Sequence, residues 1–345
     1  MALQDLGRYL GSPKVFVHRV IPYSQGRGKE GPTVIVCGID ISKSWIDVHF
    51  SSKDARFDND ERGWKDLLRF AGGACLFVME ASGSHHLGLA EWLHQRGREV
   101  SVINPARSAH FARALGLRNK TDRVDARLLA LYASKIEVPR FKPASPAQKE
   151  LRALTRHRES LVAQAASCKI RLQESELTQF ERELLTSQQA FLKGQVSACK
   201  ERLRVLQRSP ELSGRVELLR TIPGLGETSA LAVLSECRPE EFEGAGQLAA
   251  YAGLCPKERT SGSSIRSRPR LSKSGNARLR KALYMPALAA IRAKGPLAGH
   301  YQRLLERGKS RMAAIGAVMH KILRIVYGVL KSCQPFNPAL ALTQS

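Results

Sequence analysis

The sequence has no Cys-x-x-Cys pair and no recognisable secretory signal. Its seven cysteines are scattered, so it predicts neither a disulfide framework nor a cysteine zinc site and favours a reducing compartment. The N-terminal segment lacks the apolar centre of a signal peptide. No apolar stretch is expected to reach membrane-spanning length. We therefore expect a cytoplasmic protein with no membrane partner.

Acidic and aromatic residues are also scarce. Asp and Glu number 31 against 55 Lys and Arg, a net charge of +24. Such an excess predicts a polyanionic partner, most often nucleic acid, although a basic housekeeping protein such as a ribosome-associated factor would share it. Aromatic residues make up 6% of the chain, and none interleaves the most basic stretch. Base stacking of the single-strand-binding type is therefore not indicated.

The N-terminal part alternates strand and helix patterns. Residues 1–32 form a basic leader, and a mixed domain is expected over 33–138. Apolar runs bounded by turn residues predict strands, and amphipathic runs ending at glycine predict helices. Asp47 alternates with Ile46 and Val48, so we expect it to face away from the core. The predicted order is strands at 33–41, 45–50 and 55–59, helix 61–73, strand 74–81, helix 85–97, strand 99–105 and helix 120–135.

The remainder reads as helical. A Pro-rich break at 138–148 precedes a highly charged helical segment at 147–208, which predicts a long hairpin or coiled coil. Residues 209–333 form a mainly helical C-terminal domain that contains a basic loop, and 334–345 form a tail. With 345 residues, the chain is long enough for two or three domains with real cores.

Carboxylates end two of the apolar strands. Asp40 and Glu80 follow runs that suit buried strands, where an uncompensated charge is costly. Asp122 and Asp125 are three residues apart and share a face of the last predicted helix. Polar strand ends and helix-start acids are the structural alternative. If the four acids converge, two Mg²⁺ ions would offset their repulsion and clamp a phosphodiester, since no His or Cys set is present; Mn²⁺ would substitute.

The order of strands and acids resembles the RNase H-like fold in the version of the RuvC Holliday-junction resolvase. The segments "GIDISK", "MEASG", "NP" and "KTDRVDA" resemble more closely the DEDD transposases of insertion sequences, which are bridge-RNA-guided recombinases. The match by eye runs from Gly38 to Leu330 and leaves out the leader. The resemblance implies that Asp40, Glu80, Asp122 and Asp125 bind two Mg²⁺ ions.

Two further segments support this resemblance. "TIPGLGETSALAVL" resembles a helix-hairpin-helix, in which Gly224 and Gly226 would let the backbone approach phosphates; a plain helix-helix turn is the alternative. "YAGLCPKERTSGSS" with "KSGNARLRKAL" resembles the second signature of these transposases, in which a serine is the nucleophile. That position is Ser261. The neighbouring candidates are Ser263, Ser264 and Ser267.

The serine lies in a strongly basic stretch that has almost no acids. Arginine forks suit phosphate oxygens, and an unneutralised run would repel itself; a solvated charge run is the alternative. No histidine is near Ser261 in sequence, so its activation would come from metal, a carboxylate or DNA-induced closure. The basic residues are Arg259, Arg266, Arg268, Arg270, Lys273, Arg278, Arg280 and Lys281.

We therefore expect a transposase that cuts and rejoins donor and target double-stranded DNA through a phosphoserine link. The resemblance further implies a structured non-coding guide RNA, dimers that form a tetrameric synapse, and a composite centre that joins the metal domain of one subunit to the serine domain of another. It would act in a bacterial or archaeal cytoplasm, at the nucleoid. Two alternatives stay open: a resolvase-like nuclease in which metal-activated water attacks, and a non-catalytic nucleic-acid-binding scaffold.

Overall fold

The computed structural model describes residues 35–72, 75–81, 83–116, 122–261 and 265–339; for 122–124, 258–261 and 265–269 it describes the backbone alone. The predicted leader at 1–32 lies outside the described residues. The chain divides after Pro143 into two compact units, which are described separately below.

The N-terminal unit is built on a five-stranded sheet in the order β3-β2-β1-β4-β5. Strands β1, β2 and β3 form an antiparallel meander, whereas β1, β4 and β5 run parallel. This mixed α/β arrangement confirms the predicted fold class and is consistent with an RNase H-like domain. The strands are β1 Ile35–Ile41, β2 Trp45–Phe50, β3 Lys53–Asp58, β4 Cys75–Glu80 and β5 Glu99–Ile103.

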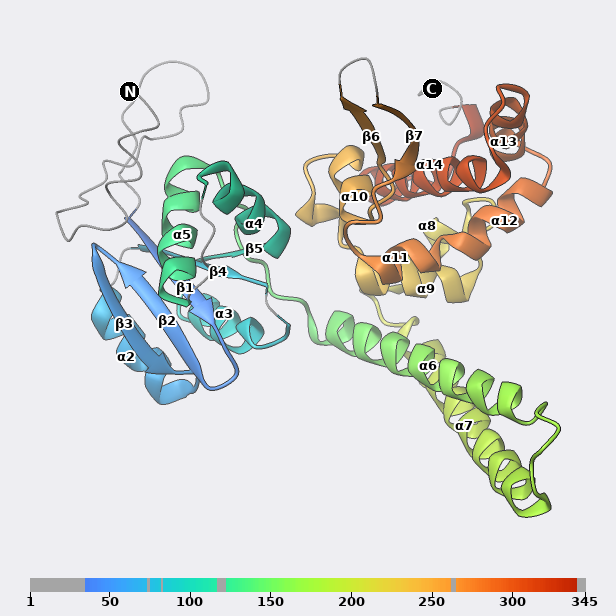
Figure 1. The fold of residues 1–345 in the computed structure, drawn as a ribbon, viewed down its shortest axis with the longest axis horizontal. Coiled ribbons are helices and arrows are strands. Elements are labelled where there is room, and N and C mark those ends of the chain that lie inside the picture. The colour runs from blue at the N-terminus through green and yellow to red at the C-terminus, as the bar shows by residue number, and fades with distance from the viewer. Residues whose placement is uncertain (1–34, 73–74, 82, 117–121, 262–264, 340–345) are drawn as a thin grey trace. The chain divides into compact units, whose positions relative to one another are not determined.

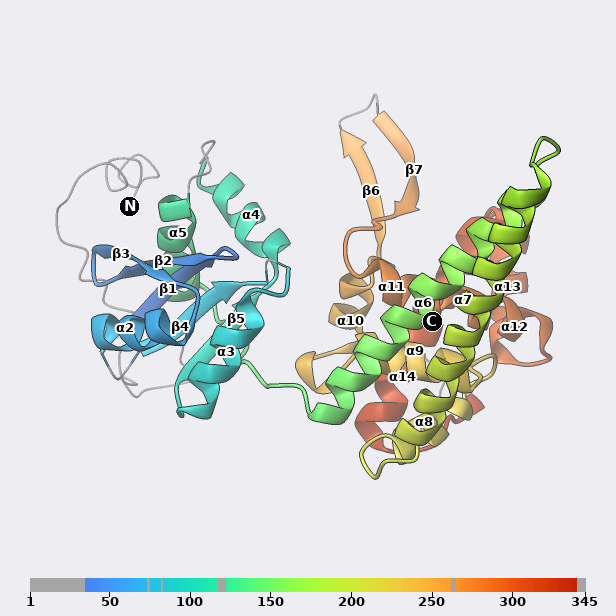
Figure 2. The same cartoon turned by 90° about the horizontal axis from the view of Figure 1, so that it is seen from below.

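Helices cover both faces of this sheet (Figures 1 and 2). Helices α2 (Glu61–Ala71) and α3 (His86–Gln95) pack on the face that carries Ile39, Ile46 and Phe77. Helices α4 (Pro105–Ala114) and α5 (Asp122–Lys135) lie on the other face. Helix α4 was missed in the sequence, because "NP" reads as the end of a strand. In the structure Asn104 caps α4, accepting a hydrogen bond from the Ala106 amide at 2.8 Å.

Helix α5 packs unusually close to β1. A methyl group on Gly38 would lie 2.1 Å from the carbonyl oxygen of Ala126 and 2.7 Å from the amide nitrogen of Ala130. Only glycine allows that approach. Further along α5, Ala133 packs in the cluster that contains Val36. Helix α5 therefore runs antiparallel to β1, and its first turn lies toward the end of β1 that carries Asp40.

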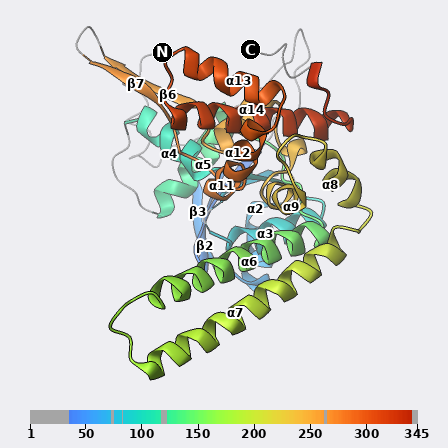
Figure 3. The ribbon, with the colours of Figure 1, turned by 90° about the vertical axis from the view of Figure 1, so that its right-hand side faces the viewer.

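The second unit begins with a helical hairpin (Figure 3). Helix α6 (Pro146–Arg171) and helix α7 (Gln179–Leu206) pack along their length, as the charged helical pattern predicted. Leu161, Cys168, Leu192 and Cys199 form a small cluster between them. A reciprocal capping box between Thr178 and Glu181 starts α7.

Seven helices form the body of the second unit around one large apolar cluster. Helix α14 lies within it: Val318, Ile322 and Val326 are fully buried. Contrary to the sequence expectation, α14 is long and apolar enough to span a membrane, but half of its apolar window is buried inside the protein, as expected for a core helix. The helices are α8 Ser213–Arg220, α9 Glu227–Glu236, α10 Ala245–Tyr251, α11 Ala277–Ala282, α12 Tyr284–Arg292, α13 Pro296–Glu306 and α14 Arg311–Ser332.

A two-stranded ribbon stands out from this helical body (Figures 1 and 2). Strand β6 (Pro256–Ser261) pairs antiparallel with β7 (Ile265–Leu271). The prediction of a basic loop was therefore wrong for this segment. The polar composition hid a period-two pattern, in which Arg266, Arg268 and Arg270 occupy alternate positions of β7.

Candidate active site

Asp40 and Glu80 end neighbouring parallel strands. Ile39 of β1 is registered with Met79 of β4, so the next residues along, Asp40 and Glu80, are adjacent across the pair. Adjacent strands lie about 4.8 Å apart. Alternation along the strands places both acids on the face that also carries Gly38 and Val78, which α5 covers. Both side chains are partly exposed.

The first turn of α5 reaches the same edge of the sheet. Asp125 is partly exposed and directly precedes Ala126, whose carbonyl packs against Gly38. Asp122 opens the helix one turn earlier, and its side chain lies outside the described set. The topology thus gathers the backbone positions of all four predicted acids at one end of the sheet.

Glu80 has a hydrogen-bond partner that the sequence analysis missed. The Ser108 hydroxyl, on the buried face of α4, donates to Glu80 Oε2. The same hydroxyl lies 2.9 Å from the Pro105 carbonyl oxygen. The "NP" segment starts α4 at Pro105, and Ser108, in the first turn of that helix, reaches Glu80. The sequence signal for this contact was a helix-capping residue, Asn104, followed four residues later by a serine, Ser108.

Asp47 is buried, which corrects the prediction that it faces away from the core. It is registered with Asp40 across the β1–β2 pair, and 2% of it is exposed. The sheet is covered on both faces, so the side opposite Ile46 and Val48 is also interior. Arg56 donates to Asp47 from Nε at 3.0 Å and from a terminal nitrogen at 2.7 Å. This pairing offsets the cost of burying the charge.

An ion pair also fastens α5 to β3, the outermost strand of the sheet. Arg127 of α5 donates from Nε to Asp54 of β3 at 3.2 Å, and His49 Nδ1 lies 2.7 Å from the same carboxylate. Burial raises the pKa of Asp54, but the hydrogen bonds from Arg127 and His49 outweigh it and lower the pKa below its ordinary value. Arg127, two positions after Asp125, is therefore held in place by an ion pair, which helps to fix the first turns of α5.

The donor chemistry at this edge fits a hard divalent cation. Asp40, Glu80 and Asp125 offer oxygen donors, the ligands that Mg²⁺ prefers. Among the side chains that the structure describes, no three His, Cys, Asp or Glu residues are grouped as a ready metal site. The predicted set includes Asp122, whose side chain is outside that description. The four-acid site thus stays a prediction, supported by the placement of its strands and helix.

The serine and the first arginines of the basic stretch are placed by backbone alone. Ser261 ends β6, registered with Ile265. Its side chain and those of Arg259, Arg266 and Arg268 lie outside the described set, as do Ser263, Ser264 and Ser267. Arg270 and Lys273 are exposed.

The last basic residues have partners within the protein. Arg280 donates to the Ala252 carbonyl at 2.8 Å, and Lys281 pairs with Glu159 of α6. Arg278 Nε lies 3.8 Å from the same carboxylate. The C-terminal end of this basic stretch therefore has a counter-anion, which comes from a distant helix and could not be seen in the local sequence. A phosphate-binding role for Arg280 would compete with an existing contact.

The two glycines between α8 and α9 differ in their surroundings. Gly224 has φ +88°, and a methyl group there would lie 2.3 Å from the Pro286 carbonyl oxygen of α12. Packing against α12 thus accounts for this glycine, in line with the plain-turn alternative. Gly226 precedes α9 and has open space around it, so phosphate approach there stays a prediction.

Comparisons with known proteins identify related chains. Residues 37–180 match a DEDD transposase family of IS110 elements, described as "Transposase", and residues 216–302 match "Transposase IS116/IS110/IS902 family". The chain is 30% identical over 315 residues to the "Pilin gene-inverting protein" of Moraxella lacunata, covering 87% of this chain and 97% of that protein. It is 24% identical over 334 residues to the "Transposase for insertion sequence element IS1328" of Yersinia enterocolitica, covering 86% and 97%.

Proposed function

This chain belongs to the IS110/IS116/IS902 family of DEDD transposases, and from that premise we propose that it cuts and rejoins DNA through a covalent bond to Ser261. The observation that supports the proposal is that the backbone positions of Asp40 and Glu80, at the ends of β1 and β4, lie at the same end of the sheet as the first turn of α5, which carries Asp125. Acids gathered there are suited to phosphodiester chemistry with a bound cation.

In this proposal Asp40, Glu80, Asp122 and Asp125 hold two Mg²⁺ ions, with Mn²⁺ as a substitute. The ions would supply Lewis-acid stabilisation of the charge on the reacting phosphate. Ser261 Oγ attacks the phosphorus and gives up its proton. The bond from phosphorus to one deoxyribose oxygen breaks, and that oxygen takes up a proton and leaves as a free DNA hydroxyl. Attack by a second DNA hydroxyl reverses these changes and frees the serine. Basic residues of the ribbon, Arg270 among them, would contact the DNA backbone.

The proposal includes a structured guide RNA that pairs with donor and target DNA, and dimers that meet in a tetrameric synapse on nucleoid DNA. In that assembly the carboxylates of one subunit would act beside the serine of another. The net charge of +24 supports binding of both nucleic acids. The hairpin of α6 and α7 offers an extended surface for assembly or RNA.

The deciding experiment compares Ser261→Ala with the wild type on DNA that carries matched sites. The wild type should form a protein–DNA adduct that survives denaturation, and the variant should lose it while still binding Mg²⁺. Normal strand cleavage by the variant would instead favour the resolvase-like nuclease. Recombination that survives Asp40→Ala with Glu80→Ala would favour the scaffold. Sequencing of the RNA that co-purifies with the protein tests the guide RNA separately. Absence of a discrete bound RNA would contradict the guide-RNA part of the proposal.

Similarity to the pilin gene-inverting proteins favours one variant of this function, namely inversion of the DNA between two sites. The test uses two DNA substrates, one with its sites in inverted orientation and one with its sites in direct orientation. If this chain acts as those relatives are named, inversion should dominate on the first substrate. Excision should dominate on the second.

A further inference from the structure

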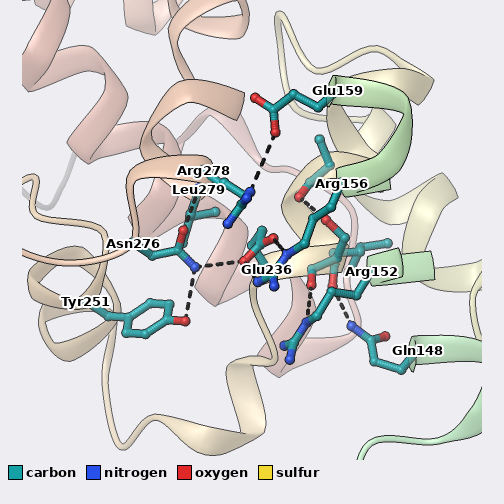
Figure 4. Close-up of polar contacts among 12 residues, drawn as sticks. Gln148, Arg152, Arg156, Glu159, Glu236, Tyr251, Asn276, Arg278 and Leu279 are labelled. Carbon is teal, nitrogen blue, oxygen red and sulfur yellow. Dashed lines mark hydrogen bonds and ion pairs between the residues drawn. The ribbon is translucent and has the colours of Figure 1, made fainter. Parts of the chain in front are cut away.

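One buried carboxylate joins three segments of the helical unit that are far apart in sequence (Figure 4). The Glu236 side chain, at the end of α9, is 4% exposed. Arg156 of α6 donates to both of its oxygens, at 2.7 and 2.9 Å. Asn276 donates from Nδ2 to Oε2 at 2.9 Å. Two elements on opposite sides of Glu236 are thereby tied to the same group.

Both polar atoms of the Asn276 side chain, Nδ2 and Oδ1, have hydrogen-bond partners here. Its Nδ2 also lies 3.0 Å from the Tyr251 hydroxyl, and its Oδ1 accepts from the Leu279 amide at 3.0 Å, which caps α11 (Figure 4). Its backbone amide donates to the Tyr251 carbonyl at 2.7 Å. Asn276 therefore fixes the end of α10 to the start of α11, and the β6–β7 ribbon leaves and returns between these two points.

The chain is tightly closed at the base of the ribbon, which we define as residues 251–255 with 271–276 and call the ribbon foot. The Ser272 amide donates to the Cys255 carbonyl at 2.9 Å, and the Lys273 amide donates to the Gly253 carbonyl at 3.1 Å. Gly275 has φ +130°, and a methyl group there would lie 2.2 Å from the Tyr251 carbonyl oxygen. This close approach explains why a glycine stands at position 275 of the "KSGN" segment.

Helix α6 holds the other side of the joint. Gln148 donates to the Leu234 carbonyl at 2.6 Å, and Arg152 donates to the Ser235 carbonyl at 3.0 Å. With Arg156 these residues are four apart and lie along one face of α6. They satisfy carbonyls at the end of α9 and place positive charge where the helix dipole favours it. The face of α6 that meets Glu236 is therefore itself firmly positioned.

We propose that Glu236 is a positioning residue that locks the ribbon foot to α6 and so sets where the far end of the ribbon, with Ser261, is presented. The inference rests on the proposed function of Ser261 as nucleophile. Burial raises the pKa of Glu236, but the hydrogen bonds from Arg156 and Asn276 outweigh it and lower the pKa, so Glu236 is an anion at neutral pH. Movement of the hairpin helix α6 would reach the ribbon foot, and through it the serine, by way of this carboxylate.

The test compares Glu236→Gln with Glu159→Gln, which removes the partly exposed carboxylate that pairs α6 with Lys281. Glu236→Gln should slow formation of the serine–DNA adduct by about ten-fold or more and leave DNA affinity within about two-fold. Amide hydrogen exchange at 251–276 should accelerate while exchange in α14 is unchanged. Glu159→Gln should alter neither. Wild-type adduct rate and wild-type exchange in Glu236→Gln would overturn the proposal.

Ser261→Ala, run in parallel, separates the two proposals. If the adduct persists in Ser261→Ala, the proposed function fails, and hydrogen exchange at the ribbon foot still judges the role of Glu236. If Ser261→Ala abolishes the adduct and Glu236→Gln changes nothing, only the positioning role fails. Should Glu236→Gln unfold, Arg156→Gln removes the contact to α6 alone. It should then show the same local exchange, and unaltered exchange would overturn the proposal.

Exchanging the carboxylate at position 236 with the amide at position 276 tests whether Glu236 acts by positioning the ribbon foot rather than by transferring a proton. Asn276→Asp keeps the capping oxygen of α11 but sets a second carboxylate against Glu236. In the double variant Glu236→Gln with Asn276→Asp, amide and carboxylate exchange places, and Arg156 remains beside one negative charge. Each single change should slow the adduct, and the double should recover at least half of the loss. A double variant no better than either single would overturn the proposal.

Discussion

Glu236 in the helical unit and the neighbouring acids Asp40 and Glu80 in the N-terminal unit lie in different surroundings. Glu236 in the helical unit is met by a guanidinium and an amide of its own chain, so its charge contributes to the fold. Asp40 and Glu80 in the N-terminal unit lie side by side at the ends of parallel strands, and Glu80 is met by the Ser108 hydroxyl. Like charges brought together repel each other, and a bound cation would offset that repulsion. In the proposed function, therefore, the first acid serves the structure and the second pair would serve a cation.

Asp40→Asn tests this contrast most strongly. It should lower Mg²⁺-dependent DNA cleavage on the order of a thousand-fold, since a ligand at the reacting phosphate is lost. In the absence of metal it should leave the free energy of unfolding unchanged or higher, because a repelling charge is removed. Cleavage on denaturing gels and urea unfolding measure the two effects. Glu236→Gln should lower metal-free stability, and a loss of stability in both would break the comparison.

Gly38→Ala should damage the carboxylate edge without touching an acid. The added methyl group meets the Ala126 carbonyl at 2.1 Å, so α5 must shift away from β1. We expect a loss of about 3 kcal/mol in the free energy of unfolding, together with weaker Mg²⁺ binding. Gly226→Ala is the matched control, because that glycine has open space, and it should cost within about 1 kcal/mol. Equal losses would contradict the packing argument.

Ser108→Ala sharpens the account of Glu80. Without the hydroxyl, Glu80 loses the hydrogen bond that orients Oε2, and Mg²⁺ affinity measured by calorimetry should fall about ten-fold. Ser134→Ala removes a hydroxyl that donates within α5, to the Leu131 carbonyl at 2.8 Å, and serves as the control. If Ser108→Ala binds Mg²⁺ as tightly as the wild type while Asp40→Asn does not, Ser108 has no orienting role.

Elements with a clear periodic pattern could be predicted from the sequence. The apolar runs that end at Asp40 and Glu80, and the helix that begins at Asp122, are all present in the structure. Local pattern is sufficient there, because buried strands and amphipathic helices are specified by neighbouring residues. The adjacency of Asp40 and Glu80 follows from the parallel pairing of β1 and β4, which the sequence analysis did not predict.

Features that depend on distant partners could not be predicted. The burial of Asp47 depends on α5, 75 to 88 positions further along the chain, and on Arg56. The partner of Lys281 is Glu159, 122 residues away. The β6–β7 ribbon was read as loop because charge and serine content outweighed its alternation. For Asp47 and Lys281 a long-range contact set the outcome, whereas the ribbon is a local hairpin whose alternation was overlooked.

Acid pH gives the mildest test of the same comparison. The pKa of Glu236 is lowered from 4.5, so its contribution to stability is complete above that value and is lost as pH falls through the folded pKa. The groups that face it are Arg152 and Arg156 of α6, Asn276, and Tyr251, whose pKa burial raises, so Tyr251 is neutral in this window. Urea unfolding should show wild type more stable than Glu236→Gln at pH 7, and this gap should narrow below pH 4.5. A gap that is constant with pH would mean that Glu236 contributes by its shape rather than by its charge.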